Sequence, residues 1–151
     1  MAEFDWKKQK VAIGCDHAGF DLKQEIVAYL KKLDIECYDF GVYDRTPADY
    51  PSIAKEVALA VADHEFDKGI IICGSGLGVC IVANKVVGIR AVTCHETYSA
   101  RVSRTHNDAN VLTMGARVIG VDLAKDVVLT WLKTEFEGGR HQVRVSMIEE
   151  Q

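Results

Sequence analysis

Short runs of β-branched residues alternate along the chain with longer stretches in which apolar residues follow helical spacing. This alternation is typical of βαβ units, which build parallel sheets. It predicts five strands, at 10–15, 35–40, 69–73, 89–94 and 110–114. The run from Gly69 to Cys73 contains no polar residue, as expected of a central strand that helices cover on both faces.

The segments between these strands carry apolar stripes that predict helices. The stripes are Leu22, Ile26, Tyr29, Leu30 and Leu33; Ile53, Val57, Ala60 and Val61; and Leu123, Val127, Val128, Trp131 and Leu132. Asp49 followed by Pro51 is typical of a helix start, with Asp49 as the N-cap. We therefore predict one α/β domain over residues 1–151, with its core at about 10–148. Its architecture is a three-layer αβα sandwich around a five-stranded parallel, Rossmann-like sheet.

Composition and charge exclude several classes of protein. With 151 residues, 48% hydrophobic and 26% charged, the chain has the balance of a globular protein and not of a disordered or fibrous one. A net charge of −4 without a basic block predicts no nucleic-acid partner. The longest uncharged run, 69–84, holds four glycines and is shorter than the roughly 20 apolar residues of a membrane helix. We expect no membrane partner. The charged N-terminus resembles no secretory signal, which indicates a cytoplasmic protein.

Cysteine, histidine and arginine positions add three expectations. The five cysteines include no CxxC pair, so neither a disulfide framework nor a zinc ribbon is predicted. The five histidines lie on separate predicted elements and HExxH is absent, so we predict no metal and no cofactor. Five of the seven arginines follow residue 100. Their planar side chains suit phosphate binding, with solvated surface charge as the alternative.

The segment Cys73-Gly74-Ser75-Gly76-Leu77-Gly78 connects the third predicted strand to a helix. Glycines at alternate positions allow successive backbone N–H groups to face one concavity, and the helix N-terminus adds partial positive charge. The same dipoles would stabilise a thiolate at Cys73. The alternatives are a simple tight turn and a buried, unreactive thiol. Val79 is inconsistent with both the GxGxxG fingerprint and a Cys-x5-Arg phosphatase loop.

Two further candidates are pairs of polar residues at element ends. Asp16 and His17 follow the first predicted strand, which places a carboxylate beside an imidazole. Parallel sheets bind ligands beyond the carboxyl ends of their strands, so this position favours a functional role. The alternative is a helix cap followed by a loop residue. His106 and Asn107 end a predicted helix before the fifth strand, where a histidine is alternatively a helix C-terminal cation.

Three arginines complete the set of candidates. Arg117 follows the fifth predicted strand. Arg140 and Arg144, four residues apart at a helix start introduced by two glycines, share one helix face and could clamp a phosphate. Pairing of Arg140 with Glu137 is the alternative, and it leaves Arg144 unexplained.

Seven motifs together resemble the type B ribose-5-phosphate isomerases, in the order and at the spacing of that family. They are GCDHAGFDLK at 14–23, DYP at 49–51, CGSGLG at 73–78, ANK at 83–85, GIRA at 88–91, SRTHNDAN at 103–110 and EGGRHQVR at 137–144. The resemblance covers residues 10 to about 148. It implies an aldose-ketose isomerase of the pentose phosphate pathway that interconverts D-ribose 5-phosphate and D-ribulose 5-phosphate through an enediolate. The wider family also includes isomerases of galactose 6-phosphate and allose 6-phosphate.

The resemblance also implies roles for individual residues. Cys73 would be the base that moves a proton between C1 and C2, His106 would assist ring opening, and Ser75 would support the enediolate oxygen. Substrate contacts are implied for Asp16, His17, Gly74, Gly76, Leu77, Gly78, Asn107, Arg117, Arg140 and Arg144. One branch of the family carries a glutamate at the position of Val79, so this chain resembles the cysteine branch.

The family's assembly is a homodimer or a dimer of dimers whose sites combine residues from two chains. Three alternatives to a ribose-5-phosphate isomerase stay open from the residues alone. They are an isomerase of a hexose 6-phosphate, a sugar-phosphate-binding module without activity, and a thiol-dependent hydrolase.

Overall fold

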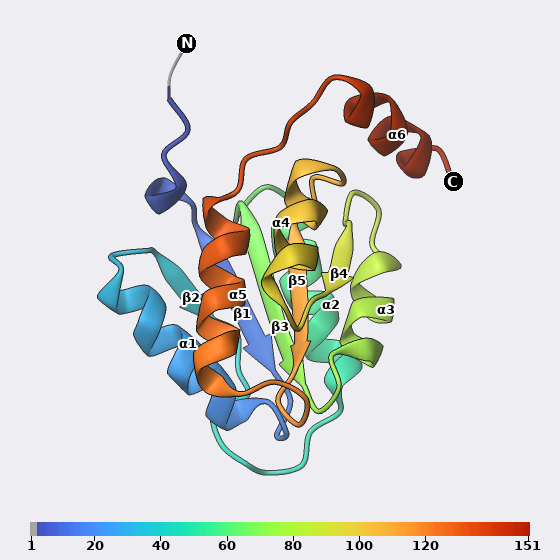
Figure 1. The fold of residues 1–151 in the computed structure, drawn as a ribbon. Helices are drawn as coiled ribbons and strands as arrows, with labels where there is room; N and C mark the ends of the chain where they lie inside the picture. Colours follow the sequence, from blue (N-terminus) through green and yellow to red (C-terminus); the bar gives the residue numbers. More distant parts are fainter. Residues whose placement is uncertain (1–2) are drawn as a thin grey trace.

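The fold comes from a computed structural model, which describes residues 3–151 (Figure 1). The strands are β1 (Val11–Cys15), β2 (Cys37–Asp39), β3 (Lys68–Cys73), β4 (Ala91–Thr93) and β5 (Val111–Gly115). The helices are α1 (Phe20–Lys32), α2 (Tyr50–Ala62), α3 (Leu77–Asn84), α4 (Thr97–Thr105), α5 (Val121–Lys133) and α6 (Arg140–Glu149), after a short 3-10 helix η1 (Trp6–Lys8). Within residues 3–151, no helix is long and apolar enough to cross a membrane.

The five strands form one parallel sheet in the order β2-β1-β3-β5-β4, which confirms the predicted αβα architecture. β3 lies at the centre, and all its residues except Lys68 are buried, as its uninterrupted apolar run predicted. β2 and β4 have three residues each, fewer than the six predicted for each. Both are edge strands, which pair on one side only, so fewer of their residues are held in a ladder.

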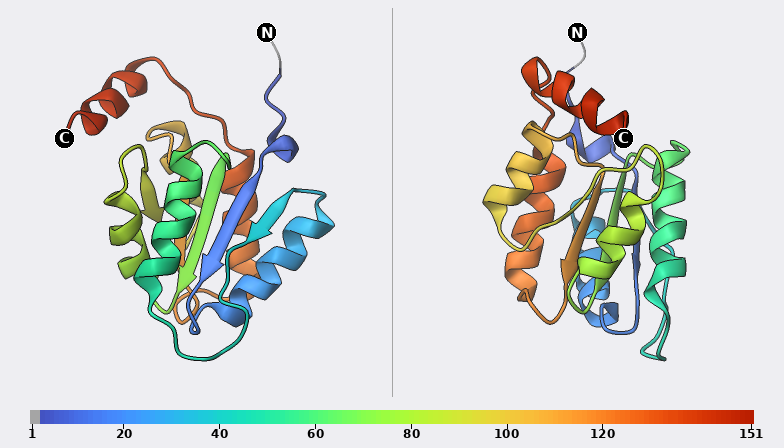
Figure 2. Two further views of the ribbon diagram at one scale, coloured as in Figure 1. Left: turned by 180° about the vertical axis from the view of Figure 1, so that it is seen from behind. Right: turned by 90° about the vertical axis from the view of Figure 1, so that its right-hand side faces the viewer.

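Helices cover both faces of the sheet (Figure 2), and side chains of the central strands alternate between two cores. Val11 and Ile13 of β1 contribute to the core covered by α1, α4 and α5. Ala12 contributes to the core covered by α2 and α3. Helix α6 lies outside both layers, near the edge of the sheet where the strands begin (Figure 1). Only His141 and Val145 of α6 are buried, so most of this helix is uncovered in the single chain.

A buried lysine fixes the loop between β2 and α2. The side chain of Lys23, on α1, is fully buried and its ammonium lies 2.7 Å from a carboxylate oxygen of Asp39. The ammonium also donates to the carbonyl of Val42, and the Asp39 carboxylate accepts the N–H of Gly41 at 2.8 Å. These contacts fix the first residues of the loop. The loop leads to Tyr50, which borders the candidate site.

Replacing Lys23 with methionine should destabilise the protein by about 2–3 kcal/mol, because Asp39 loses its cation and the Val42 carbonyl loses its donor. Urea unfolding measures the change in the free energy of unfolding. Lys31→Met is the matched control, since Lys31 lies on the same helix and is exposed. Equal stability of the two variants would contradict a stabilising role for the buried pair.

Candidate active site

Three adjacent strands place polar residues at one edge of the sheet. Asp16 follows β1, Cys73 ends β3 and Arg117 follows β5. All three line a cavity of about 430 Å³, together with Tyr50, Gly74, Ser75, Gly78 and Val118. The ends of β3 and β5 are joined there, because Ala116 donates its N–H to the Cys73 carbonyl at 2.8 Å and Arg117 donates to the Gly74 carbonyl at 3.1 Å. This part of the predicted site therefore forms within one chain.

The sulfur of Cys73 accepts the backbone N–H of Gly76 at 3.1 Å. The residue is 5% exposed and lines the cavity. An N–H dipole directed at sulfur stabilises a thiolate. Burial raises the pKa of Cys15 to about 11, that of Cys37 to about 12 and that of Cys94 to about 11. Those three thiols stay protonated at neutral pH.

The glycines of the loop after β3 permit close packing. Gly76 has φ +80°, and a Cβ there would lie 2.8 Å from the backbone of Met114. A Cβ on Gly78 would lie 2.5 Å from the ring of Tyr50. The steric need for glycine at these two positions is therefore explained by a tight turn, without a role in binding. The loop still lines the cavity with Gly74, Ser75 and Gly78, and α3 begins at Leu77, so the N-terminal dipole of α3 lies beside Cys73.

Asp16 and His17 are held by backbone contacts. Asp16 is 7% exposed and its carboxylate accepts the N–H of Gly19, the N-cap residue of α1, at 3.0 Å. Asp16 is therefore not the helix cap of the alternative interpretation, because Gly19 is the N-cap and no side chain caps α1; its carboxylate holds the turn before the helix. Nδ1 of His17 accepts the N–H of Ala48 at 3.1 Å, so the neutral ring carries its proton on Nε2, which can donate to a ligand.

Tyr50 is a site residue that sequence reasoning did not assign. A second cavity, of about 630 Å³, shares Tyr50 and Asp16 with the first and adds His17. Tyr50 belongs to the DYP motif of the sequence, but only the packing of α2 shows that this residue lines the cavity. Asp49 is the N-cap residue of α2 and Pro51 lies in the first turn, which confirms the predicted helix start, although the Asp49 side chain makes no capping hydrogen bond.

The remaining candidates form a second group at the opposite end of the sheet (Figure 1). His106 and Asn107 follow α4 and precede β5, whereas Arg117 follows β5. The five residues of β5 alone span about 16 Å at 3.3 Å per residue. Arg140 and Arg144 lie on α6 at the same end as His106. The expectation that functional residues gather at the carboxyl ends of the strands therefore does not hold for this group.

Within this second group, two imidazole rings are stacked. The ring centroids of His106 and His141 lie 4.2 Å apart with an interplanar angle of 11°. Glu137 lies 3.4 Å from Nε2 of His141 and does not pair with Arg140. The alternative role of Arg140, an ion pair with Glu137, is therefore excluded. Ligand atoms of His106, Glu137 and His141 all lie within 4.8 Å of one another, a cluster that the separate positions of these residues along the sequence did not reveal. Among residues 3–151, Arg140 and Arg144 make no ion pair, and both are exposed.

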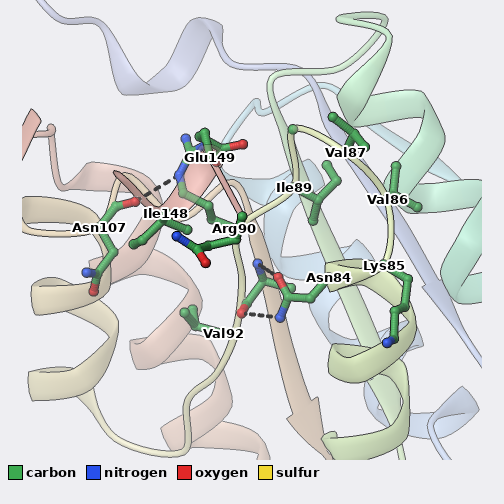
Figure 3. Close-up of a pocket in the computed structure, with 13 residues that line it drawn as sticks. Asn84, Lys85, Val86, Val87, Ile89, Arg90, Val92, Asn107, Ile148 and Glu149 are labelled. Atoms are coloured by element: carbon green, nitrogen blue, oxygen red, sulfur yellow. Dashed lines mark hydrogen bonds and ion pairs between the residues drawn. The ribbon is translucent and has the colours of Figure 1, made fainter. Parts of the chain in front are cut away.

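Arg90 contacts both the turn after α4 and helix α6, the two parts of this second group (Figure 3). Its Nε donates to the carbonyl of Asn107 at 2.9 Å, and its Nη1 lies 2.6 Å from a carboxylate oxygen of Glu149 on α6. Arg104 donates to the carbonyl of Thr134 at 3.2 Å, before α6. A cavity of about 570 Å³ lies beside Arg90, between the segment 84–92 and the end of α6. These contacts hold the turn at His106 and helix α6 in a fixed arrangement relative to each other.

Comparison with known proteins agrees with the motifs. The family model described as Ribose/Galactose Isomerase matches residues 11–148. The chain belongs to the ribose/galactose isomerase family. Within this family, it is 56% identical over 140 residues to a protein of Escherichia coli named ribose-5-phosphate isomerase B, covering 93% of this chain and 94% of that one.

Two further proteins are similar to this chain over most of its length. The solved structure of ribose-5-phosphate isomerase B from Clostridium thermocellum has a TM-score of 0.92 and 55% identity, covering 93% of this chain and 95% of that one. A Pectobacterium atrosepticum protein named D-erythrulose-4-phosphate isomerase is 47% identical, covering 91% of each chain. Proteins of similar sequence thus carry names that refer to sugar phosphates of different length.

Proposed function

We propose that this protein is a ribose-5-phosphate isomerase, with residues 1–151 acting as a single domain. It interconverts D-ribose 5-phosphate and D-ribulose 5-phosphate in the pentose phosphate pathway. The observation that carries the proposal is the sulfur of Cys73, which accepts an N–H from Gly76 and lines the cavity at the carboxyl edge of the sheet. The identity of 56% to a protein named for this activity supports the choice of substrate.

The proposed chemistry is proton transfer between neighbouring carbons. The Cys73 thiolate removes the proton from C2 of the open-chain aldose, and the electron pair forms a C1–C2 double bond, leaving negative charge on O1. Backbone N–H groups of the loop at Gly74 to Gly78, with the hydroxyl of Ser75, stabilise this enediolate. Return of the proton from Cys73 to C1, with transfer of the O2 proton to O1, gives the ketose. Hydrogen has moved from C2 to C1, and the step needs no cofactor.

Phosphate binding requires the second group of residues. Arg140 and Arg144 are exposed and four residues apart, which suits a phosphate, but they lie at the far end of the sheet from Cys73. A pentose phosphate is shorter than β5 and cannot contact both groups in one chain. We infer that His106, Asn107, Arg140 and Arg144 of one copy complete the site formed by Asp16, His17, Cys73 and Arg117 of another.

Exposed apolar surface supports a homodimer or a dimer of dimers. Leu77 and Ile81 on α3 are 59% and 63% exposed, and Val143 and Met147 on α6 are 62% and 59% exposed. Each pair is four residues apart and so shares one helix face. A second copy of the chain, which the divided site requires, is the partner that we propose for these faces. The five cysteines are free, which fits a reducing cytoplasm.

A comparison of rates on several substrates tests the function. The protein is assayed on ribose 5-phosphate, erythrulose 4-phosphate, allose 6-phosphate and galactose 6-phosphate, and the highest kcat/KM should belong to ribose 5-phosphate. Exchange of the substrate C2 hydrogen with solvent identifies an isomerase. Thermal stabilisation by the sugar phosphate without turnover would instead indicate a binding module, and a trapped covalent adduct on Cys73 would indicate a hydrolase.

His106 is expected to act in ring opening, in which O1 loses its proton, the C1=O1 bond forms, the C1–O4 bond of the furanose breaks and O4 gains a proton. His106→Ala should lower kcat/KM for ribose 5-phosphate about 100-fold or more, but that for 4-deoxyribose 5-phosphate by less than about threefold. The second compound lacks the 4-hydroxyl and cannot form the furanose ring. Equal losses on the two substrates would exclude a role in ring opening.

A further inference from the structure

His141 has no role in the proposed reaction, yet it is the most buried polar residue of α6. It lies in the first turn of the helix and is 4% exposed. Its ring is stacked on that of His106, with 4.2 Å between the centroids. Its Nε2 is buried without a hydrogen-bond partner and approaches Glu137 at 3.4 Å. Burial of an imidazole without a hydrogen bond at this nitrogen is costly, so the contact with His106 calls for an explanation.

Backbone contacts hold the first turn of α6 against the end of α4. Gly138 and Gly139 have φ +68° and +57°, which turn the chain sharply before the helix. The N–H of Glu137 donates to the carbonyl of Thr105 at 3.2 Å, next to His106. The N–H of His141 donates to the carbonyl of Gly138 at 3.1 Å. The course of the backbone therefore brings the two rings together.

A neutral partner suits this stack. Burial lowers the pKa of His141, and so do His106, Arg140 and Arg144 through their electrostatic interaction with it, while Glu137 opposes them. His141 is therefore neutral at physiological pH and gives His106 an aromatic face. Stacking restricts rotation of the His106 ring about its side-chain bonds and leaves the in-plane nitrogens free to face a ligand.

The same three side chains could be read as a metal site, because two histidines and a glutamate are zinc ligands. The geometry does not favour this. A bound ion lies in the plane of each ligating imidazole, and two rings inclined by only 11° do not meet in a common point near both nitrogens. Metal binding would require one ring to leave the stack.

We propose that His141 is a positioning residue that holds the ring of His106 at the orientation needed for opening the sugar ring. The inference rests on the proposed function of His106. It adds a specific requirement, namely that position 141 provides a flat ring and not a particular ring nitrogen. Phenylalanine should therefore replace His141, whereas leucine, which fills similar space without a flat face, should not.

The variants His141→Phe and His141→Leu test this requirement, with Gln142→Ala on the exposed face of α6 as the matched control. For His141→Leu we expect kcat/KM on ribose 5-phosphate to fall about 10- to 100-fold, with a change of less than about threefold on 4-deoxyribose 5-phosphate. His141→Phe and the control should keep most of the native rate. Equal losses on both substrates, or a Phe variant as slow as the Leu variant, would overturn the proposal.

Nuclear magnetic resonance gives a measurement that does not depend on activity. The carbon-bound ring protons of His106 should show the upfield ring-current shift of a stacked neighbour in the native protein and in His141→Phe, and should lose it in His141→Leu. An unchanged signal in His141→Leu would overturn the proposal even if the protein is no isomerase. Native activity that EDTA removes and Zn²⁺ restores would also overturn it, by making the two rings metal ligands.

Discussion

Replacing Cys73 with alanine should lower kcat on ribose 5-phosphate by about 10³-fold or more, because the reaction loses the base that removes the C2 proton. The cavity would still contain Asp16, Arg117 and the backbone of the loop after β3. Binding of ribose 5-phosphate should therefore change little, which isothermal titration calorimetry measures. Exchange of the C2 hydrogen with solvent, followed by nuclear magnetic resonance in D₂O, should stop together with turnover.

The control for this variant is Cys37→Ala. Cys37 lies on the edge strand β2, it does not line the cavity, and burial raises its pKa to about 12, so it has no place in the proton transfer. Cys37→Ala should keep the native rate. Alkylation by iodoacetamide should modify Cys73 in preference to Cys15, Cys37 and Cys94 and should abolish activity in proportion. A Cys73→Ala variant that retains a tenth of the native rate would exclude Cys73 as the base.

The fold could be predicted from the sequence because its signals are local. The uninterrupted apolar run of β3 identified the central strand, and the helical stripes of α1, α2 and α5 identified the faces that pack on the sheet. The lengths of β2 and β4 could not be predicted in this way. They depend on which strands lie at the edges, and strand order is set by packing between distant segments.

The candidate site was predictable in part for the same reason. Asp16, Cys73 and Arg117 each follow or end a strand, and parallel strands carry their carboxyl ends to one edge, so their meeting follows from topology. The stack of His106 on His141 had no such signal. Helix α6 buries only two residues, so its apolar pattern did not reveal what it packs against, and two histidines 35 residues apart meet only through the turn at Gly138 and Gly139.

The division of the site between two copies should be visible as recovered activity. Cys73→Ala and His106→Ala are each nearly inactive on ribose 5-phosphate. In a heterodimer of the two variants, one site combines the intact Cys73 group of one chain with the intact His106 group of the other, and the second site carries both changes. Unfolding and refolding an equal mixture forms heterodimers in half of all pairs, so we expect about one quarter of the native activity.

The matched control is a mixture of Cys73→Ala with Asp16→Ala. Both residues line the same cavity, so each site of their heterodimer carries one of the two changes and neither is intact. This mixture should stay as inactive as its components. Recovery in the first mixture but not in the second requires that the two groups of residues come from different chains, because refolding cannot repair a site contained within one chain. Absence of recovery in the first mixture, with refolded native protein fully active, would show that the group at His106 and Arg140 acts elsewhere. The stacking of His106 on His141 would then have a role other than binding or opening the sugar.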